Sequence, residues 1–406
     1  MQAVEAIWRI ESARLIAGLA RFVRDVGLAE DLAQDALVAA LEQWPRDGVP
    51  DAPGPWLMAV AKRKAIDTLR RQEAYTKKLI LLGEEQEDPD WDDAIDDHIK
   101  DDLLRLIFTA AHPALTPDAQ KALILRMLCG LSTPEIARAF LIPEATAAQR
   151  IVRAKRTLAG QTFELPTRDE TAARIRQVQQ VVYLIFNEGY AATEGEDWAR
   201  PALCHEAMRL GRLLASLLPD DAETHGLLAL MELQASRLAA RTSAEGEPVP
   251  LLEQDRRRWD RALIRHGLDA LDRAEAAGGG PYTIQAMIAA CHARAIKPDH
   301  TDWPRIAALY EVLAHLQPTS VVRLNHAVAL GFAGDAERGL EIIDQIEEAP
   351  ELKTYPQLPA VRAELLDRLG RKDEAYAELQ RAAGMSRNVA EQRLFRRRAE
   401  RIEPRS

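Results

Sequence analysis

Apolar residues recur at intervals of three and four along almost the whole chain, and the alternation of two that a strand would show is nearly absent. This pattern predicts an all-α fold. We expect helices near 3–25, 29–44, 54–72, 99–111, 117–129, 133–140 and 144–159. Helical patterns continue beyond Pro166 to the C-terminus, with proline and glycine marking the breaks.

A weak internal repeat lies in the C-terminal part of the chain. Residues 322–343 and 359–379 each show an apolar helix pattern, a glycine and a second helix pattern with small residues. The two glycines, Gly334 and Gly370, are 36 positions apart, close to the ~34-residue period of tetratricopeptide repeats. Stacked helix pairs of this kind form a solenoid whose concave face binds partners. We therefore expect a tetratricopeptide-like helical-repeat tail.

Charge along the chain is strongly segregated. The chain has 406 residues, which predicts two to four domains, and its net charge is −10. Nevertheless, residues 60–71 carry five bases and one acid, and residues 144–158 carry four bases and one acid. Residues 84–102 between them carry eleven acids and one base. Any nucleic-acid contact must therefore be local, at two basic segments joined by an acidic spacer that is also typical of a solvated linker.

The second basic segment, residues 131–158, has the pattern of a helix-turn-helix. Ser132 and Glu135 have capping-box spacing, and Pro143 suits the first position of the following helix. In that helix we expect Ala148, Ile151, Val152 and Leu158 to face inward. The residues that we expect to face DNA are Thr146, Gln149, Arg150, Arg153 and Arg156. A solvated amphipathic helix is the alternative.

The first basic segment, residues 55–71, and the helix before it, residues 28–45, are less specific. In the first basic segment the inward-facing residues would be Leu57, Ala61, Ala65 and Leu69. Its cationic candidates are Lys62, Arg63, Lys64, Arg70 and Arg71. In residues 28–45, acidic and polar side chains crowd the first turns, where the helix dipole favours carboxylates. This effect alone would explain these side chains. The alternative is that Asp31, Gln34 and Asp35 form an acidic and polar patch that binds a protein partner.

Catalytic and metal-binding patterns are absent from the sequence. The three cysteines, Cys129, Cys204 and Cys291, are far apart, which suits a reducing cytoplasm. Two of them precede histidines, but no spacing typical of a zinc site accompanies them. We find no nucleophile–base arrangement, phosphate loop, signal peptide or membrane-length apolar run. We therefore expect a cytoplasmic protein that is not an enzyme and has no cofactor or metal.

Three segments in this order resemble an RNA polymerase sigma factor of the extracytoplasmic-function class. They are AEDLAQDALVAALEQWP, PWLMAVAKRKAIDTLRR and LSTPEIARAFLIPEATAAQRIVRAKRTL. The resemblance implies core RNA polymerase as a partner, through its β′ clamp helices and β flap, and promoter DNA. It places Asp31, Gln34 and Asp35 against the polymerase. It assigns the cations of residues 55–71 to the −10 element, and the recognition helix to the −35 element.

The resemblance also implies a division of the chain. Residues 1–72 would form sigma domain 2, residues 73–112 the linker, residues 113–160 sigma domain 4, and residues 161–406 a tetratricopeptide-like regulatory domain. Such an extension resembles one subgroup of the family, in which the tail regulates the sigma factor within one chain. A protein or ligand on this tail is the expected further partner. The alternative is a stand-alone helix-turn-helix regulator with a protein- or ligand-sensing tail.

Two motifs in the tail have open interpretations. Asn187, Glu188 and Tyr190 form either a ligand pocket or, as we favour, the C-terminal cap of a helix around Gly189. The run Arg256–Arg258, followed by Trp259, is typical of a solvated charged face, although it could contact DNA or protein.

Overall fold

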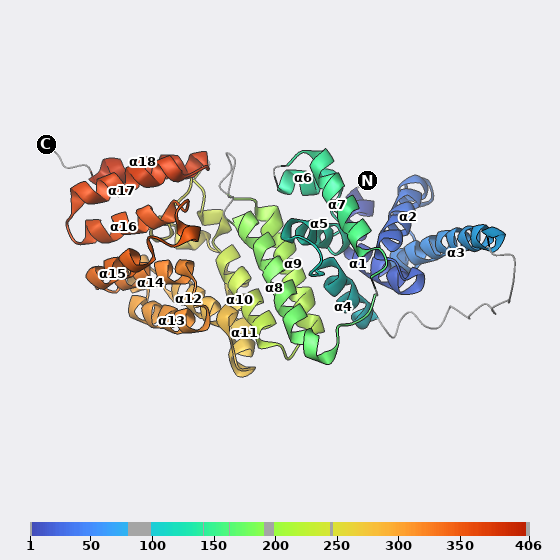
Figure 1. Cartoon of the computed structure of the whole chain (residues 1–406), viewed down its shortest axis with the longest axis horizontal. Coiled ribbons are helices and arrows are strands. Elements are labelled where there is room, and N and C mark those ends of the chain that lie inside the picture. Colours follow the sequence, from blue (N-terminus) through green and yellow to red (C-terminus); the bar gives the residue numbers. More distant parts are fainter. Residues whose placement is uncertain are drawn as a thin grey trace. The chain divides into compact units, whose positions relative to one another are not determined.

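The computed structural model describes residues 2–79, 99–140, 142–161, 163–190, 199–243 and 247–402. Within these ranges the regular elements are helices, and the only strand-like pairing is an isolated bridge between Thr242 and Pro248. The all-α prediction is therefore confirmed for the described chain (Figure 1). The chain forms two compact units, residues 1–184 and 185–406, and helix α8 (Arg168–Tyr190) spans the division.

The first unit begins with seven helices. They are α1 (Gln2–Val23), α2 (Val26–Asp47), α3 (Pro53–Leu79), α4 (Ile99–Ala110), α5 (Pro117–Met127), α6 (Thr133–Ala139) and α7 (Glu144–Leu158). Side-chain caps begin three of them, because Asp25, Thr116 and Ser132 each accept a hydrogen bond from a backbone N–H in the first turn. The predicted helices are all present. The largest difference is α3, which continues seven residues beyond the expected end at residue 72, to Leu79.

The core of the first unit is built around α1. This helix packs against α2, α3 and α4, and it also contacts α5. Gly130, in the turn after α5, has a φ of +68°, and an added Cβ would lie 2.8 Å from the Ser12 hydroxyl and 3.2 Å from Trp8 Nε1. The turn after α5 therefore lies directly on α1. The acidic run of residues 84–93 lies outside the described residues. The three predicted domain boundaries stay predictions.

The second unit continues the chain with ten α-helices and several short 3₁₀ turns in its described part. The α-helices are α9 (Pro201–Leu217), α10 (Ala222–Ala235), α11 (Arg261–Ala276), α12 (Pro281–Arg294), α13 (Trp303–Leu316), α14 (Ser320–Phe332), α15 (Ala336–Ile346), α16 (Gln357–Arg368), α17 (Lys372–Met385) and α18 (Val389–Ile402). The 3₁₀ turns are η2 (Leu238–Ala240), η3 (Leu251–Glu253), η4 (Arg256–Arg258), η5 (Pro298–His300) and η6 (Pro350–Leu352).

Consecutive helices of the second unit pack as pairs, as the repeat predicts. The segment 322–343 contains most of α14 and α15, and the segment 359–379 contains most of α16 and part of α17. Gly334 and Gly370 lie in the two turns with φ of +100° and +76°, a conformation that glycine adopts without steric cost. Both helix pairs share one apolar core, which includes Leu324, Leu365 and Leu379.

The interpretation of Gly189 as a helix cap is wrong. Gly189 lies inside α8, which extends to Tyr190, and its φ is not positive. An added Cβ would meet the backbone N of Cys204 and Cβ of Leu203, both at 2.8 Å. This glycine is therefore required by the close approach of α9. The neighbouring Glu188 pairs with Arg200 at 2.5 Å, so its carboxylate also joins α8 to the start of α9.

The arginine run at 256–258 is only partly a solvated face. Arg256 is 5% exposed, and its guanidinium donates to the carbonyl oxygens of His292 and Ala295 and to the hydroxyl of Thr301. Arg257, by contrast, is exposed and pairs with Asp255. Arg256 therefore joins η4 to the end of α12, and its buried guanidinium is not accessible to a partner.

Candidate nucleic-acid interface

The helix-turn-helix is built as the sequence predicts, with a complete capping box. The Ser132 hydroxyl accepts from the Glu135 N–H at 3.4 Å, and the Glu135 carboxylate accepts from the Ser132 N–H at 2.8 Å. Burial raises the pKa of Glu135, but hydrogen bonds from Ser132 and the charge of Arg9 outweigh it and hold that pKa below its ordinary value. The carboxylate is therefore charged at neutral pH, and α6 has a rigid start.

Helix α7 presents a different inner face from the one predicted. Its buried residues are Ala147, Ile151, Ala154 and Leu158. Ala148 is only partly buried and Val152 is 54% exposed, so these two assignments are wrong. Pro143 lies at the N-cap, one position before the predicted one. The inner face is rotated toward the small alanines, which let α7 approach α5 and α6 closely.

The outer face of α7 carries the predicted DNA-reading side chains. Gln149, Arg153 and Arg156 are exposed and follow one another at helical spacing. Arg153 and Arg156 make no ion pair with any residue that the structure describes. Arg150 differs, because it pairs with Asp118 of α5 at 3.2 Å, and Thr146 is half-buried in the first turn. Two unpaired guanidinium groups and an amide thus face solvent together.

Helix α3 carries the second set of predicted cations. Leu57, Ala61 and Ala65 are buried, as predicted, and Leu69 is partly exposed. Arg63 and Arg70 are exposed, while Lys62 and Lys64 are partly buried. Lys64 Nζ lies 3.4 Å from the carboxylate of Asp35, so this cation joins α3 to α2. Arg71 lies within α3, but its side chain is outside the described set.

Helix α2 presents the residues predicted to contact polymerase. Asp31 and Asp35 are exposed and Gln34 is half-buried along one side. Val38 and Leu41 continue this side and are 51% and 42% exposed. Sequence reasoning missed these two apolar residues, although their spacing from Asp31 and Asp35 placed them on the same face. The outer side of α2 is therefore acidic in its first turns and apolar further along.

The structure brings a third group of charges to α2 that the sequence did not reveal. Glu30 is 1% exposed, and its carboxylate accepts from Arg126 Nε of α5 at 2.8 Å. Lys155 of α7 forms ion pairs with both Glu30 and Asp31. In the sequence Glu30 is one of several acids in the first turns of a helix. Only its burial in the structure distinguishes it from the exposed acids Asp31 and Asp35.

The described residues provide no metal site, and the cysteines are inert in character. No group of three or more His, Cys, Asp and Glu side chains in the described ranges could hold a metal ion. All three cysteines are buried and outside any disulfide, and burial raises the pKa of Cys204 to about 12. Among the described helices, none is long and apolar enough to cross a membrane.

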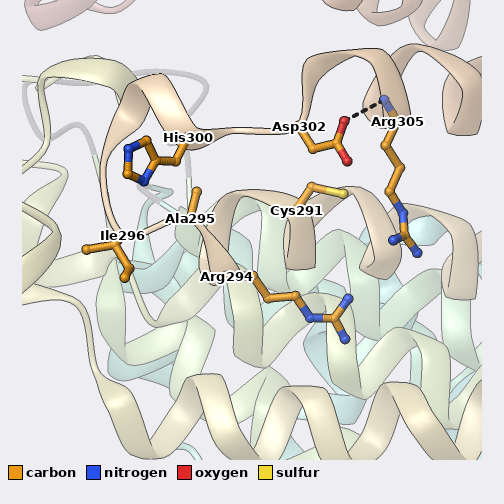
Figure 2. A pocket seen from close by; sticks show the side chains of 7 residues that line it. All are labelled: Cys291, Arg294, Ala295, Ile296, His300, Asp302 and Arg305. Carbon is orange, nitrogen blue, oxygen red and sulfur yellow. Dashed lines mark hydrogen bonds between the residues drawn. The ribbon is translucent and has the colours of Figure 1, made fainter.

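The second unit contains an open cavity of about 280 Å³ at the end of α12. Its lining residues are Cys291, Arg294, Ala295, Ile296, His300, Asp302 and Arg305. Figure 2 shows the guanidinium groups of Arg294 and Arg305 on one side of it. Asp302 is occupied as the N-cap of α13, where its carboxylate accepts from the Arg305 N–H at 3.0 Å. Two guanidinium groups would favour an anionic ligand over a cationic one.

Family models match three parts of the chain. Sigma-70 region 2 matches residues 10–75, which contain most of α1, all of α2 and most of α3. Sigma-70 region 4 matches residues 105–158, which contain α5, α6 and α7. A family of unknown function, DUF6596, matches residues 174–275.

Similar proteins agree with these matches. An uncharacterised protein of Rhizobium meliloti is 42% identical over 385 residues, which cover 93% of this chain and 90% of that relative. A probable RNA polymerase sigma-C factor of Mycobacterium bovis and the ECF RNA polymerase sigma factor SigC of Mycobacterium tuberculosis are each 29% identical over 139 residues. These matches cover 34% of this chain and 71% of each relative.

A capped helix-turn-helix and a cationic helix, each within a matching region, define a transcription factor of the sigma type. The chain belongs to the sigma-70 family, in its extracytoplasmic-function group, and it extends well beyond region 4. The resemblance stated from the sequence is therefore confirmed, as is the fold class of two sigma regions followed by a helical tail.

Proposed function

We propose that this protein binds core RNA polymerase and directs it to a restricted set of promoters. In this proposal α2 contacts the polymerase, α3 contacts the opened −10 element, and α7 reads the −35 element. The chain performs no catalysis, because the phosphodiester chemistry belongs to the polymerase. The observation that carries the proposal is the outer face of α7, where exposed Gln149, Arg153 and Arg156 lie on a helix held by a complete capping box.

The chemistry of this face suits the major groove. An arginine can donate two hydrogen bonds to the edge of a guanine, and a glutamine can do the same to an adenine. Arg153 and Arg156 have no competing carboxylate among the described residues, so they reach DNA without first breaking an ion pair. Arg150 must release Asp118 to do so, and we therefore assign it a smaller contribution than the other two arginines.

The test is transcription with purified core polymerase on pooled genomic fragments, with start sites mapped. The wild-type chain should create starts that share two elements at a fixed spacing. Arg153→Ala and Arg156→Ala should each weaken promoter binding by about 1–3 kcal/mol while core binding is retained. Arg258→Ala, at an exposed arginine of the second unit, is the charge-matched control and should leave the starts unchanged.

Two results would contradict the proposal. Full-affinity binding to a duplex without core polymerase, with no new starts, would favour a stand-alone helix-turn-helix regulator. Equal loss of core binding in the arginine variants would mean that these side chains support the fold of the first unit instead of reading DNA.

The second unit is proposed to regulate the sigma regions from within the same chain. Support comes from its paired helices, which resemble repeats that bind proteins, and from the cavity beside Arg294 and Arg305. A small anion in this cavity should raise the melting temperature of the full chain. Inorganic phosphate is the first probe, and Arg294→Gln should remove its effect. An equal rise in the variant would exclude this cavity.

A further inference from the structure

Three arginines of the second unit gather around the C-terminal end of α8. Arg237 and Arg241 flank the turn η2, and their guanidinium carbons lie 5.7 Å and 3.6 Å from the centre of the Tyr190 ring. Arg256 is also near, since burial lowers its pKa and the charge of Arg237 lowers it further. All four residues fall within residues 174–275, the part matched by the family of unknown function. Tyr190 therefore lies in a strongly cationic environment.

The side chain of Arg237 has no acceptor in the described chain. It makes no hydrogen bond and no ion pair with any residue that the structure describes, and its Nε is buried. Arg241 differs, because it donates to the carbonyl oxygen of Tyr190 at 3.0 Å. A buried N–H group without an acceptor is costly, and native structures rarely contain one without a reason. An acceptor that the described residues do not supply would remove this cost.

The hydroxyl of Tyr190 is a second donor in the same position. It is buried and has no hydrogen-bond partner. The ring is fixed by Phe186, which stacks on it with 5.6 Å between ring centres, and by the guanidinium of Arg241. One O–H group and one N–H group, from Tyr190 and Arg237, are thus held near each other and are both available to one acceptor group.

The described surroundings of these two donors are positively charged. Arg256 donates only to uncharged groups among the described residues, so no described carboxylate neutralises it. Burial, followed by the charges of Arg237 and Arg256, lowers the pKa of His292 to about 3, and its neutral ring adds no charge at neutral pH. An anion at the two donors would reduce the repulsion among the guanidinium groups, whereas a cation would increase it.

We propose that Tyr190 and Arg237 bind a small carboxylate ligand, at a site separate from the cavity beside Arg294. One carboxylate oxygen accepts from the Tyr190 hydroxyl and the other from Arg237 Nε, while Arg241 and Arg256 stabilise the negative charge. A carboxylate has two oxygens for these two donors, whereas a phosphate group would leave further oxygens without donors. The site goes beyond the proposed function and does not depend on sigma activity.

Arg237 also indicates how the ligand reaches the site. Its Nε is buried, yet the residue as a whole is partly exposed, so the side chain extends from the interior to the surface. A small dicarboxylate can place one carboxylate at Nε and leave the other near the outer end of the same guanidinium. Malonate, which has two carboxylates on one carbon, is therefore the probe.

The first test is thermal unfolding of the full chain with malonate, compared with sodium chloride at equal ionic strength. At about ten times its dissociation constant, malonate should raise the melting temperature of wild type by about 3 °C. Arg237→Gln should abolish this rise. Arg258→Gln, at an exposed arginine of the same unit, is the charge-matched control and should keep it.

Two further readouts distinguish ligand binding from a structural role. Without malonate, Arg237→Gln should melt no lower than wild type, because the substitution removes a cation that lies among other cations. Tyr190→Phe keeps the ring and its stacking on Phe186 and removes only the hydroxyl. This variant should fold like wild type and bind malonate roughly tenfold more weakly in calorimetric titration.

Several results would overturn the proposal. No rise in wild type would mean that the cluster does not take a free carboxylate. An equal rise in Arg237→Gln, or a rise that is lost in Arg294→Gln instead, would place malonate elsewhere. A lower melting temperature of malonate-free Arg237→Gln, together with unchanged malonate affinity in Tyr190→Phe, would assign these side chains to the fold alone. None of these measurements involves polymerase or DNA, so the proposed sigma function is tested separately.

Discussion

Two neighbouring arginines in η4 show how much burial changes the role of one residue type. Arg256 satisfies three acceptors in the interior, whereas the Arg257 side chain is 90% exposed. Arg256→Leu should lower the free energy of unfolding by about 3 kcal/mol, because it leaves buried carbonyls without a donor. Arg257→Leu should leave it nearly unchanged, because this side chain is exposed. Urea unfolding of the full chain measures both, and equal effects would contradict the structural role of Arg256.

His292, whose carbonyl accepts from Arg256, makes stability depend on pH. Burial, followed by the charges of Arg237 and Arg256, lowers the pKa of His292 to about 3. The unfolded chain has the ordinary value near 6.5, so it binds the proton first on acidification. The contribution of neutral His292 to the free energy of unfolding is therefore fully present above pH ~6.5. It is lost as the pH falls toward 3, by up to about 1.4 kcal/mol per pH unit.

Urea unfolding at pH 7 and pH 4.5 measures this dependence. The variant His292→Gln cannot titrate at this position, so its stability should fall less steeply with acidification than that of wild type. Identical pH slopes for the two proteins would exclude His292 as the group responsible.

At the scale of elements, packing decides which glycines are required. Gly189→Ala places a methyl group 2.8 Å from the backbone N of Cys204, so α8 and α9 must move apart. We expect a loss of about 1–3 kcal/mol, which exceeds the gain of up to about 1 kcal/mol in helix propensity. Gly384→Ala in α17 meets nothing within 4 Å and should be neutral or stabilising. Thermal unfolding that ranks the two variants in the opposite order would contradict this explanation.

Helix α7 shows why the phase of an amphipathic pattern is hard to predict. Val152 is the larger apolar residue, so the sequence placed it inside, yet Ala147 and Ala154 face the core. The face that packs is chosen by the space that α5 and α6 leave, and small side chains permit the closest approach. Gln149, Arg153 and Arg156 remain on the outer side in spite of this error.

At the scale of the whole molecule, the compact units indicate where a shortened chain should end. The first compact unit extends to Leu184, and Arg174 of α8 donates to the carbonyl oxygen of Phe108 at 2.6 Å. A chain ending at residue 190 keeps this contact and should retain a folded first unit. A chain ending at residue 165 loses the contact and should melt at a lower temperature.

The chain that ends at residue 190 also tests the proposed regulation. If the second unit regulates the sigma regions, the chain 1–190 should differ from the full chain in transcription output by about fivefold or more, the usual size of such coupling. The sign of the change distinguishes inhibition from activation. Equal output from both chains would remove the regulatory role.

Several features of this protein follow from its sequence alone, because they depend on neighbours within about four residues. The helices, the capping box of Ser132 and Glu135, the glycine turns at Gly334 and Gly370, and the exposed cations of α7 belong to this set. The pattern within each of the three sigma-like segments is equally local. The order of these segments along the chain sufficed to indicate the family.

Only the tertiary structure decided which members of a charged group are buried. Glu30 and Asp31 are adjacent acids in the sequence, and Arg256 and Arg257 are adjacent bases. In each pair one side chain is enclosed by residues more than 30 positions away and the other faces solvent. Burial of a charge depends on partners that lie far along the chain, and their meeting is a property of the fold. The contact of Lys155 with α2 arises in this way.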